Sequence, residues 1–196
     1  LGAITVTSAD DVTTNGVRAA SFVQTDGSGT TTLNTGNFTT DPDGAMQTTA
    51  AAGVSIVNET IAVNSAITTT GTGIVTLNAN VATLTISATG DITSDGAVNL
   101  TGATGISTAG DVTTTGDTVT YNSATTLTGG VLINTTSGSA AGNGVTFGTT
   151  LDGNQTLGIT AGTAGDLLFT GLVGNTTPLG AITVTSADDV TTNGVR

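Results

Sequence analysis

Residues 86–93 read Ile-Ser-Ala-Thr-Gly-Asp-Ile-Thr, and residues 106–113 read Ile-Ser-Thr-Ala-Gly-Asp-Val-Thr. The two stretches share one pattern, and residues 6–13 have the same form. A looser copy runs from residue 159 to residue 167, and its Asp166 corresponds to Asp189 further along the chain. Recurring units of about 20–23 residues, each with alternating apolar positions and a turn, are typical of a β-solenoid.

Apolar and polar residues alternate along most of the chain, which places the apolar ones on one face of a strand. The eleven apolar pairs at i and i+2 that predict strands are Ile4/Val6, Val54/Ile56, Ile61/Val63, Val75/Leu77, Leu84/Ile86, Val98/Leu100, Val119/Tyr121, Val145/Phe147, Leu157/Ile159, Leu167/Phe169 and Ile182/Val184. Glycine tolerates positive φ after Asn or Asp, which predicts turns at Asn15-Gly16, Asp26-Gly27, Asp43-Gly44, Asp95-Gly96, Asn143-Gly144 and Asp152-Gly153. The least regular stretch, residues 41–52 around Pro42 and Met46, is expected to be a loop that leaves the coil.

The short repeat also predicts a register. We expect Asp91 and Asp111 at matched turns of adjacent coils, about 4.8 Å apart, with Ile86 and Ile106 stacked inside. Carboxylates at that spacing repel one another unless they are solvated or bridged, and Ca²⁺ takes hard oxygen ligands. The Gly-Gly-x-Gly-x-Asp nonapeptide of calcium-binding β-rolls is absent, as is EF-hand spacing. We therefore expect no cofactor and no metal site, with Ca²⁺ between these acids as the alternative.

A longer repeat encloses the short one. Residues 1–18, Leu-Gly-Ala-Ile-Thr-Val-Thr-Ser-Ala-Asp-Asp-Val-Thr-Thr-Asn-Gly-Val-Arg, recur without change at residues 179–196, which gives a period of 178. We interpret residues 1–178 as one tandem-repeat unit of a continuous solenoid and residues 179–196 as the start of the next identical unit. The two copies are expected to share one backbone conformation. One unit carries 12 acidic residues and a single Arg, so an array would repeat a charge of −11 along its length.

The residue types that are missing exclude several classes of function. The 196-residue chain has no His, Cys or Lys, so the commonest nucleophiles, general bases and transition-metal ligands are absent. Its only cations are Arg18 and Arg196, against 14 acidic residues and a net charge of −12. Nucleic acids and anionic membranes both need basic patches, so neither is expected as a partner. No run reaches the ~18 consecutive apolar residues of a spanning helix, so no membrane insertion is expected.

Paired carboxylates are the remaining candidates for catalysis, since two acids suffice for glycoside hydrolysis. The pairs are Asp10-Asp11, Asp188-Asp189 and Asp41-x-Asp43. Adjacent residues of a strand point to opposite faces, and the single Glu, Glu59, has no acid near it in the sequence. Tyr121 and the four Phe form no row that could bind a sugar chain. We interpret these acids as solvated turn residues, and expect no catalytic residue and no enzymatic activity; a carbohydrate-active β-helix enzyme is the weakest alternative.

Two folds compete for this pattern. A tandem of Ig-like sandwiches would divide one unit into two domains of about 90 residues. The shared motif recurs at about 20 residues, however, which is a solenoid period. Sandwiches also usually bury large aromatics, and aromatic residues make up only 3% of this chain. The sequence therefore favours an all-β chain folded as a β-solenoid, with coils of about 20–23 residues.

Two stretches also carry a resemblance to a known family. The runs at residues 157–190, which begin Leu-Gly-Ile-Thr-Ala-Gly, and at residues 121–129, Tyr-Asn-Ser-Ala-Thr-Thr-Leu-Thr-Gly, are similar to the Thr/Gly-rich β-strand repeats of giant bacterial surface proteins. These proteins include filamentous-haemagglutinin-like and autotransporter-passenger-like adhesins. The resemblance implies a right-handed β-helix, secretion to the bacterial cell surface, and adhesion or matrix building. The identity of residues 1–18 with residues 179–196 separately predicts that the chain associates with itself, end to end along the solenoid axis or laterally. A cell-surface or glycan ligand is the alternative partner.

Overall fold

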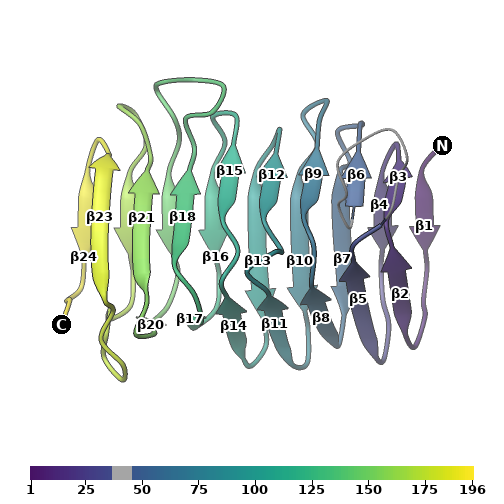
Figure 1. The fold of residues 1–196 in the computed structure, drawn as a ribbon, viewed down its shortest axis with the longest axis horizontal. Helices are drawn as coiled ribbons and strands as arrows, with labels where there is room; N and C mark the ends of the chain where they lie inside the picture. The colour runs from purple at the N-terminus through teal and green to yellow at the C-terminus, as the bar shows by residue number, and fades with distance from the viewer. Residues whose placement is uncertain (37–45) are drawn as a thin grey trace.

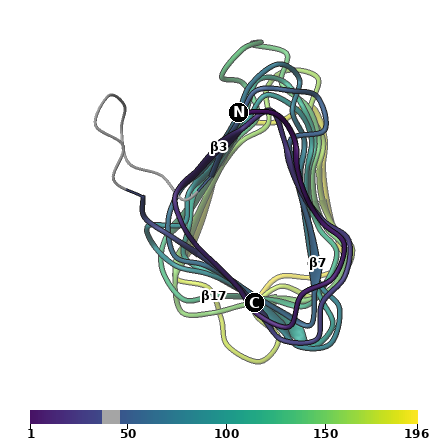
Figure 2. The ribbon, with the colours of Figure 1, turned by 90° about the vertical axis from the view of Figure 1, so that its right-hand side faces the viewer.

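The short sequence repeat folds into coils of three short strands. The computed structural model describes residues 1–36 and 46–196, and in these ranges twenty-four strands and no helix form. The coils stack along one axis (Figure 1), and the cross-section seen down that axis is a rounded triangle (Figure 2). The chain turns clockwise as it recedes from the N-terminus in Figure 2, so the solenoid is right-handed, as the resemblance implied.

Each side of the triangle is one parallel sheet. The nine-stranded sheet contains β1 (Ile4–Val6), β4 (Phe22–Gln24), β7 (Val54–Asn58), β10 (Val75–Ala79), β13 (Val98–Gly102), β16 (Val119–Tyr121), β19 (Val145–Phe147), β22 (Leu167–Phe169) and β24 (Val190–Thr192). The seven-stranded sheet contains β2 (Val12–Asn15), β5 (Thr30–Asn34), β8 (Thr60–Val63), β11 (Thr83–Ile86), β14 (Gly105–Thr108), β17 (Thr125–Leu127) and β20 (Leu151–Asp152). The eight-stranded sheet contains β3 (Val17–Ala19), β6 (Met46–Thr48), β9 (Ile67–Thr69), β12 (Ile92–Ser94), β15 (Val112–Thr114), β18 (Val131–Asn134), β21 (Thr156–Thr160) and β23 (Ala181–Ser186).

Strand pairing defines the length of each coil. Val54, Val75 and Val98 lie opposite one another on successive coils, so the two coils between them fall within the predicted length. The coil from Ile4 to Phe22 is shorter, and the coil from Phe22 to Val54 is longer because it includes residues 37–45. The coil that joins β16 to β19 is also longer, since it runs through an extended corner. The predicted length is therefore correct for the other coils and wrong for these three.

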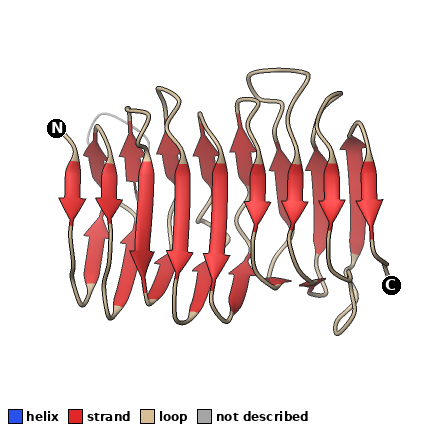
Figure 3. Ribbon diagram, turned by 180° about the vertical axis from the view of Figure 1, so that it is seen from behind, coloured by secondary structure: helices blue, strands red, loops and turns tan. Residues whose placement is uncertain are grey.

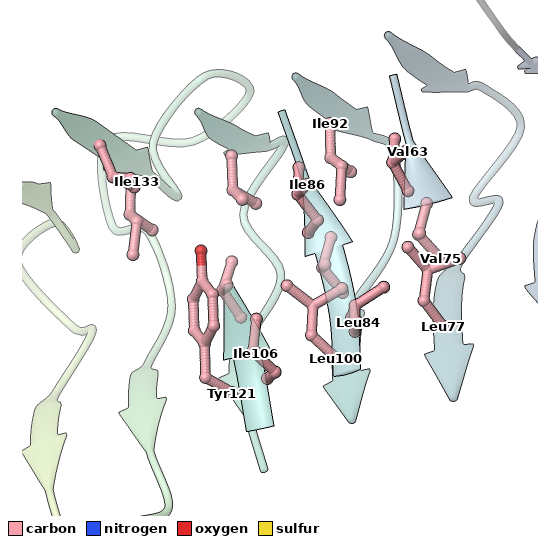
Figure 4. Packing of buried hydrophobic residues seen from close by; sticks show 14 of the residues in the cluster. Val63, Val75, Leu77, Leu84, Ile86, Ile92, Leu100, Ile106, Tyr121 and Ile133 are labelled. Atoms are coloured by element: carbon pink, nitrogen blue, oxygen red, sulfur yellow. The ribbon is translucent and has the colours of Figure 1, made fainter. Parts of the chain in front are cut away.

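The interior is built from the apolar alternation. All eleven predicted pairs lie within strands, and within the coils that have neighbours on both sides their side chains are buried. Figure 3 shows the nine-stranded sheet face on, and Figure 4 shows side chains such as Leu77, Leu84 and Leu100 filling the space between the sheets. Because the strands of the described residues pair in parallel in all three sheets, the Ig-like sandwich, which is built from antiparallel sheets, is excluded.

One predicted loop is in part a strand. Residues 46–48 form β6, and Met46 is fully buried between Val17 and Ile67 of the neighbouring coils. An unbranched thioether fills the same inward position that Ile and Val occupy elsewhere in the column. Pro42 and the rest of residues 41–45 lie outside the described residues.

The two identical segments share their strand positions but lie on different sheets. Residues 1–18 contribute to β1, β2 and β3, on the nine-, seven- and eight-stranded sheets in turn. In residues 179–196, β23 joins the eight-stranded sheet and β24 joins the nine-stranded sheet. Val195 then bridges to Val173, which bridges to Leu151 of the seven-stranded sheet. The second copy therefore begins one face earlier in the coil than the first. We expected the two copies to share one backbone conformation, and the sequence did not predict this shift.

Candidate functional site

The acidic corner residues bind the backbone of the next coil. Asp91 Oδ1 accepts a hydrogen bond from the Asp111 N–H at 2.9 Å, and Asp111 Oδ1 accepts one from the Leu132 N–H at 2.7 Å. The predicted match of these two acids on adjacent coils is confirmed, because the residues that follow them, Ile92 and Val112, are directly paired. Each carboxylate thus fastens one coil to its successor, and a charge-assisted hydrogen bond is stronger than a neutral one.

The predicted stacking of Ile86 on Ile106 is wrong. Both side chains are buried, but Ile106 lies opposite Leu84, and Ile86 lies opposite Thr108. The mismatch arises because the corner between Thr108 and Asp111 is two residues shorter than the corner between Ile86 and Asp91. Corner length therefore changes the register within a single coil.

The same use of carboxylates recurs at other corners. The Asp11 carboxylate accepts the Thr30 N–H at 2.8 Å, and Asp152 accepts the N–H groups of residues 176 and 177 at 2.7 and 2.9 Å. Asp95 accepts the Thr72 N–H at 2.8 Å and the hydroxyl of residue 115 at 2.9 Å, and the Thr72 hydrogen bond is the main reason that the pKa of Asp95 falls below 3.8. These acids stabilise the stack of coils, which gives the unusual surface charge a structural role.

The paired acids do not converge on a catalytic arrangement in the described residues. Asp10 accepts the Ser28 hydroxyl at 3.1 Å, while its neighbour Asp11 bonds the backbone of the next coil. The Asp189 N–H donates to Asp166 at 3.3 Å, and Glu59 follows β7 at a corner. Asp41 and Asp43 lie outside the described residues. Within residues 1–36 and 46–196, no three Asp or Glu side chains gather closely enough to hold a metal ion.

A column of buried hydroxyls lines the corner after the eight-stranded sheet, and sequence reasoning missed it. Its members are Thr48, Thr69, Ser94, Thr114 and Thr135. Thr69 and Ser94 both donate to the Gly73 carbonyl, at 2.5 and 3.0 Å, and Thr114 donates to the Asp117 carbonyl at 2.6 Å. Buried carbonyl groups at the corners have no strand neighbour to accept from, so they need hydrogen-bond donors such as these hydroxyls. Each member follows an apolar residue by two positions in the sequence, but the exposed Thr35 follows Leu33 in the same way, so this spacing alone does not identify the buried hydroxyls.

Three aromatic rings form a row inside the coil. Tyr121, Phe147 and Phe169 occupy one inward position on successive strands of the nine-stranded sheet, with ring centroids 4.7 and 5.3 Å apart. The row is buried, so it offers no sugar-binding surface. Burial, with a smaller effect from Asp111, raises the pKa of Tyr121. Its hydroxyl points into the interior (Figure 4) and has no hydrogen-bond partner among the described residues.

An open groove lies on the outer side of the eight-stranded sheet. It encloses about 440 Å³ over β18, β21 and β23, and no charged side chain lines it. Gly158 lies opposite Leu132 on one side and Thr183 on the other, and it has no side chain to separate them. Leu132 leans over this glycine and is 62% exposed. The groove could take a small neutral group, and nothing in its lining could perform acid–base chemistry.

Comparison with known proteins found no match: no family model, no curated protein and no solved structure matches this chain. No helix long and apolar enough to cross a membrane is found in the part of the chain that the structure describes.

Proposed function

We propose that this chain is a structural repeat of an extracellular bacterial fibre, sheath or giant adhesin, and that it acts by stacking β-coils along one axis into a rod. The observation that carries the proposal is the continuity of the sheets. Every strand of the nine-stranded sheet from β1 to β24 pairs in parallel with the strand one coil away. Each coil contacts only the coils before and after it, so the structure can extend along one axis only.

The corner acids and the uncharged strands fit this role. Asp91 and Asp111 hydrogen-bond from coil to coil, while the nine-stranded sheet contains no charged residue in any of its strands. A rod with acidic corners stays soluble through its net charge. Because the chain has no cysteine, no disulfide contributes to the cohesion of the coils. We propose a mechanical role without catalysis, a location on the bacterial cell surface, and other copies of the same unit as the main partner.

Electron microscopy tests this proposal. Purified chains of one, two and three units should appear as rods whose length grows by roughly 40 Å per unit, given ~4.8 Å per coil. Antibodies against the 196-residue chain should decorate fibres on the surface of the source cell. Separate globular particles, or labelling confined to the cell interior, would contradict the proposal.

The outer groove favours one alternative, a module that binds a glycan or a host protein. The exposed Leu132 beside Gly158 is the feature that a ligand would contact. A glycan array probed with the chain and with a Leu132→Ala variant separates the two functions. Binding that the variant loses would support the alternative, and absence of binding by both would favour the structural role.

A further inference from the structure

The identical segments at residues 1–18 and 179–196 turn the same residues inward on different faces. In the first copy Ile4 and Val6 lie opposite the buried Phe22 and Gln24, on the nine-stranded sheet. In the second copy the corresponding residues, Ile182 and Val184, lie opposite the buried Leu157 and Ile159, on the eight-stranded sheet. The inward and outward residues are thus the same in both copies, and only the face differs.

The remaining strands of the two copies show the same shift. Val12 lies opposite the buried Thr31 in the seven-stranded sheet, whereas Val190, its counterpart, lies opposite Leu167 in the nine-stranded sheet. All three faces accept apolar side chains at their inward positions. A segment with this alternation can therefore occupy any of them, and the preceding corners decide which face it takes.

The shift fixes the pitch of the repeat. β22 is the eighth strand of the nine-stranded sheet and lies seven whole turns beyond β1. After β22 the chain passes the seven-stranded sheet at Val173 and reaches the eight-stranded sheet at β23. β23 is the first strand of the second copy and the counterpart of β1, so it lies two further faces along. One repeat, residues 1–178, therefore spans seven and two-thirds turns, and not a whole number of turns.

We infer that successive units of the array are rotated by one third of a turn, so that each sheet of one unit continues as a different sheet of the next. The inference rests on the proposed tandem rod and specifies how one copy of the unit joins another. After three units, or 23 turns, the faces return to their starting positions. Each unit advances by about 37 Å and three units by about 110 Å, given ~4.8 Å per turn.

The rotation changes what the rod presents to its surroundings. In a rod with whole-turn units, the groove beside Leu132 would form a line along one side. With the one-third rotation, the groove and the uncharged face of the nine-stranded sheet point to each of the three sides in turn. The rod then offers lateral contacts to neighbouring copies on all sides, although a single unit is strongly asymmetric.

A disulfide test on the 196-residue chain examines the shift directly, because the chain has no native cysteine. Leu168 and Thr191 lie directly opposite on the outer face of the nine-stranded sheet. A whole-turn repeat would instead place Thr183 opposite Leu168, because its counterpart Thr5 lies on the outer face of that sheet. We expect the L168C/T191C variant to form an intramolecular disulfide and the matched L168C/T183C variant to remain reduced, since strand neighbours ~4.8 Å apart are within disulfide range.

The readout is the mass of the chain after alkylation under mild oxidising conditions. Protection of both cysteines in the L168C/T191C variant alone supports the shift. Protection in the L168C/T183C variant, or in neither variant, would overturn it, because residues 179–196 would then lie elsewhere.

A chain of three units separates failure of this inference from failure of the proposed function. Thr120, on the outer side of β16, is replaced by Cys in each unit and labelled with small gold particles. Three labels on three different sides of one continuous rod support the rotation. Three labels in a line on a continuous rod overturn the rotation and leave the rod intact. Three separate particles joined by flexible chain overturn the rod, and the rotation with it.

Discussion

Replacing Leu100 by alanine tests whether the interior columns hold the coils together. Leu100 is fully buried in the middle of the nine-stranded sheet, between Leu77 and Tyr121 of the adjacent coils. Leu→Ala changes in cores cost about 2–5 kcal/mol of unfolding free energy, and the cost rises with the cavity that remains. Strands on both sides are held in register by hydrogen bonds, so the space around residue 100 cannot close. We therefore expect a loss near the upper end of that range, about 4 kcal/mol.

The exposed Leu132 provides the matched control. It lies on the outer side of β18 and is 62% exposed, so Leu132→Ala removes the same atoms without opening a cavity. Surface changes of this kind usually alter stability by less than about 0.5 kcal/mol. Both variants lose the same atoms from a strand residue, but the truncated side chain faces the interior at Leu100, in β13, and the outside at Leu132, in β18.

Urea unfolding followed by circular dichroism gives the free energies, and thermal scans check them. A loss of about 4 kcal/mol corresponds to a fall in Tm of about 8–16 °C, at about 2–4 °C per kcal/mol for a chain of this size. Equal losses in the two variants, or a larger loss for Leu132→Ala, would refute the assignment of inward and outward faces and the packed interior with it.

Three further substitutions probe other features. Tyr121→Phe should raise the unfolding free energy by about 1 kcal/mol, because it removes a buried hydroxyl that has no partner among the described residues. Burial raises the pKa of Tyr121, so the unfolding free energy of the wild type should fall as the pH rises above 10.0, the ordinary pKa of tyrosine. The Tyr121→Phe variant should not show this fall, and the same fall in both proteins would contradict the burial of Tyr121. The pKa of Asp95 is lowered in the fold, so its ionised form stabilises the fold above pH 3.8, and this contribution is lost as the pH falls through the folded-state pKa. The urea midpoint of Asp95→Asn should therefore fall less than that of the wild type at acid pH. An equal fall in both proteins would argue against the Thr72 hydrogen bond. Gly53 has φ 55°, and an added Cβ would clash with the Ile74 backbone carbonyl. Gly53→Ala should therefore lower the unfolding free energy by more than about 1 kcal/mol. Gly2 has open space around it, so Gly2→Ala should leave the urea midpoint unchanged.

The sequence predicted most of the strands whose two inward residues are both apolar, because alternation is a local property, although it missed β18, whose inward residues are Val131 and Ile133. It also missed strands such as β9, β12 and β15, in which the second inward residue is Thr69, Ser94 or Thr114. These residues look like solvent-facing positions in the sequence, and they are buried because a corner carbonyl accepts their hydroxyl hydrogen. A pattern of apolar and polar letters cannot separate a buried hydroxyl from an exposed one.

The corner acids were placed correctly, and their hydrogen-bond partners were not foreseen. The match of Asp91 with Asp111 follows from the repeat, whereas the bond from the Leu132 N–H to Asp111 depends on where the next corner ends. Corner length also separated Ile86 from Ile106. The face that a segment occupies depends on the lengths of all the corners before it. The local apolar pattern does not record those lengths, so only the structure shows which face residues 179–196 occupy.

The pairing of each strand only with its neighbours one coil away has a consequence for how the chain folds. Residues that meet in the sheets are separated by a single coil, which runs from Ile4 to Phe22 at its shortest and from Phe22 to Val54 at its longest. All-β domains usually join distant strands and fold slowly for that reason. Here the loop closed by each new coil is short, and its entropy cost is similar for every coil. We therefore expect that the first coils to form provide the strand edges on which the next coil pairs, so that folding proceeds from coil to coil along the chain.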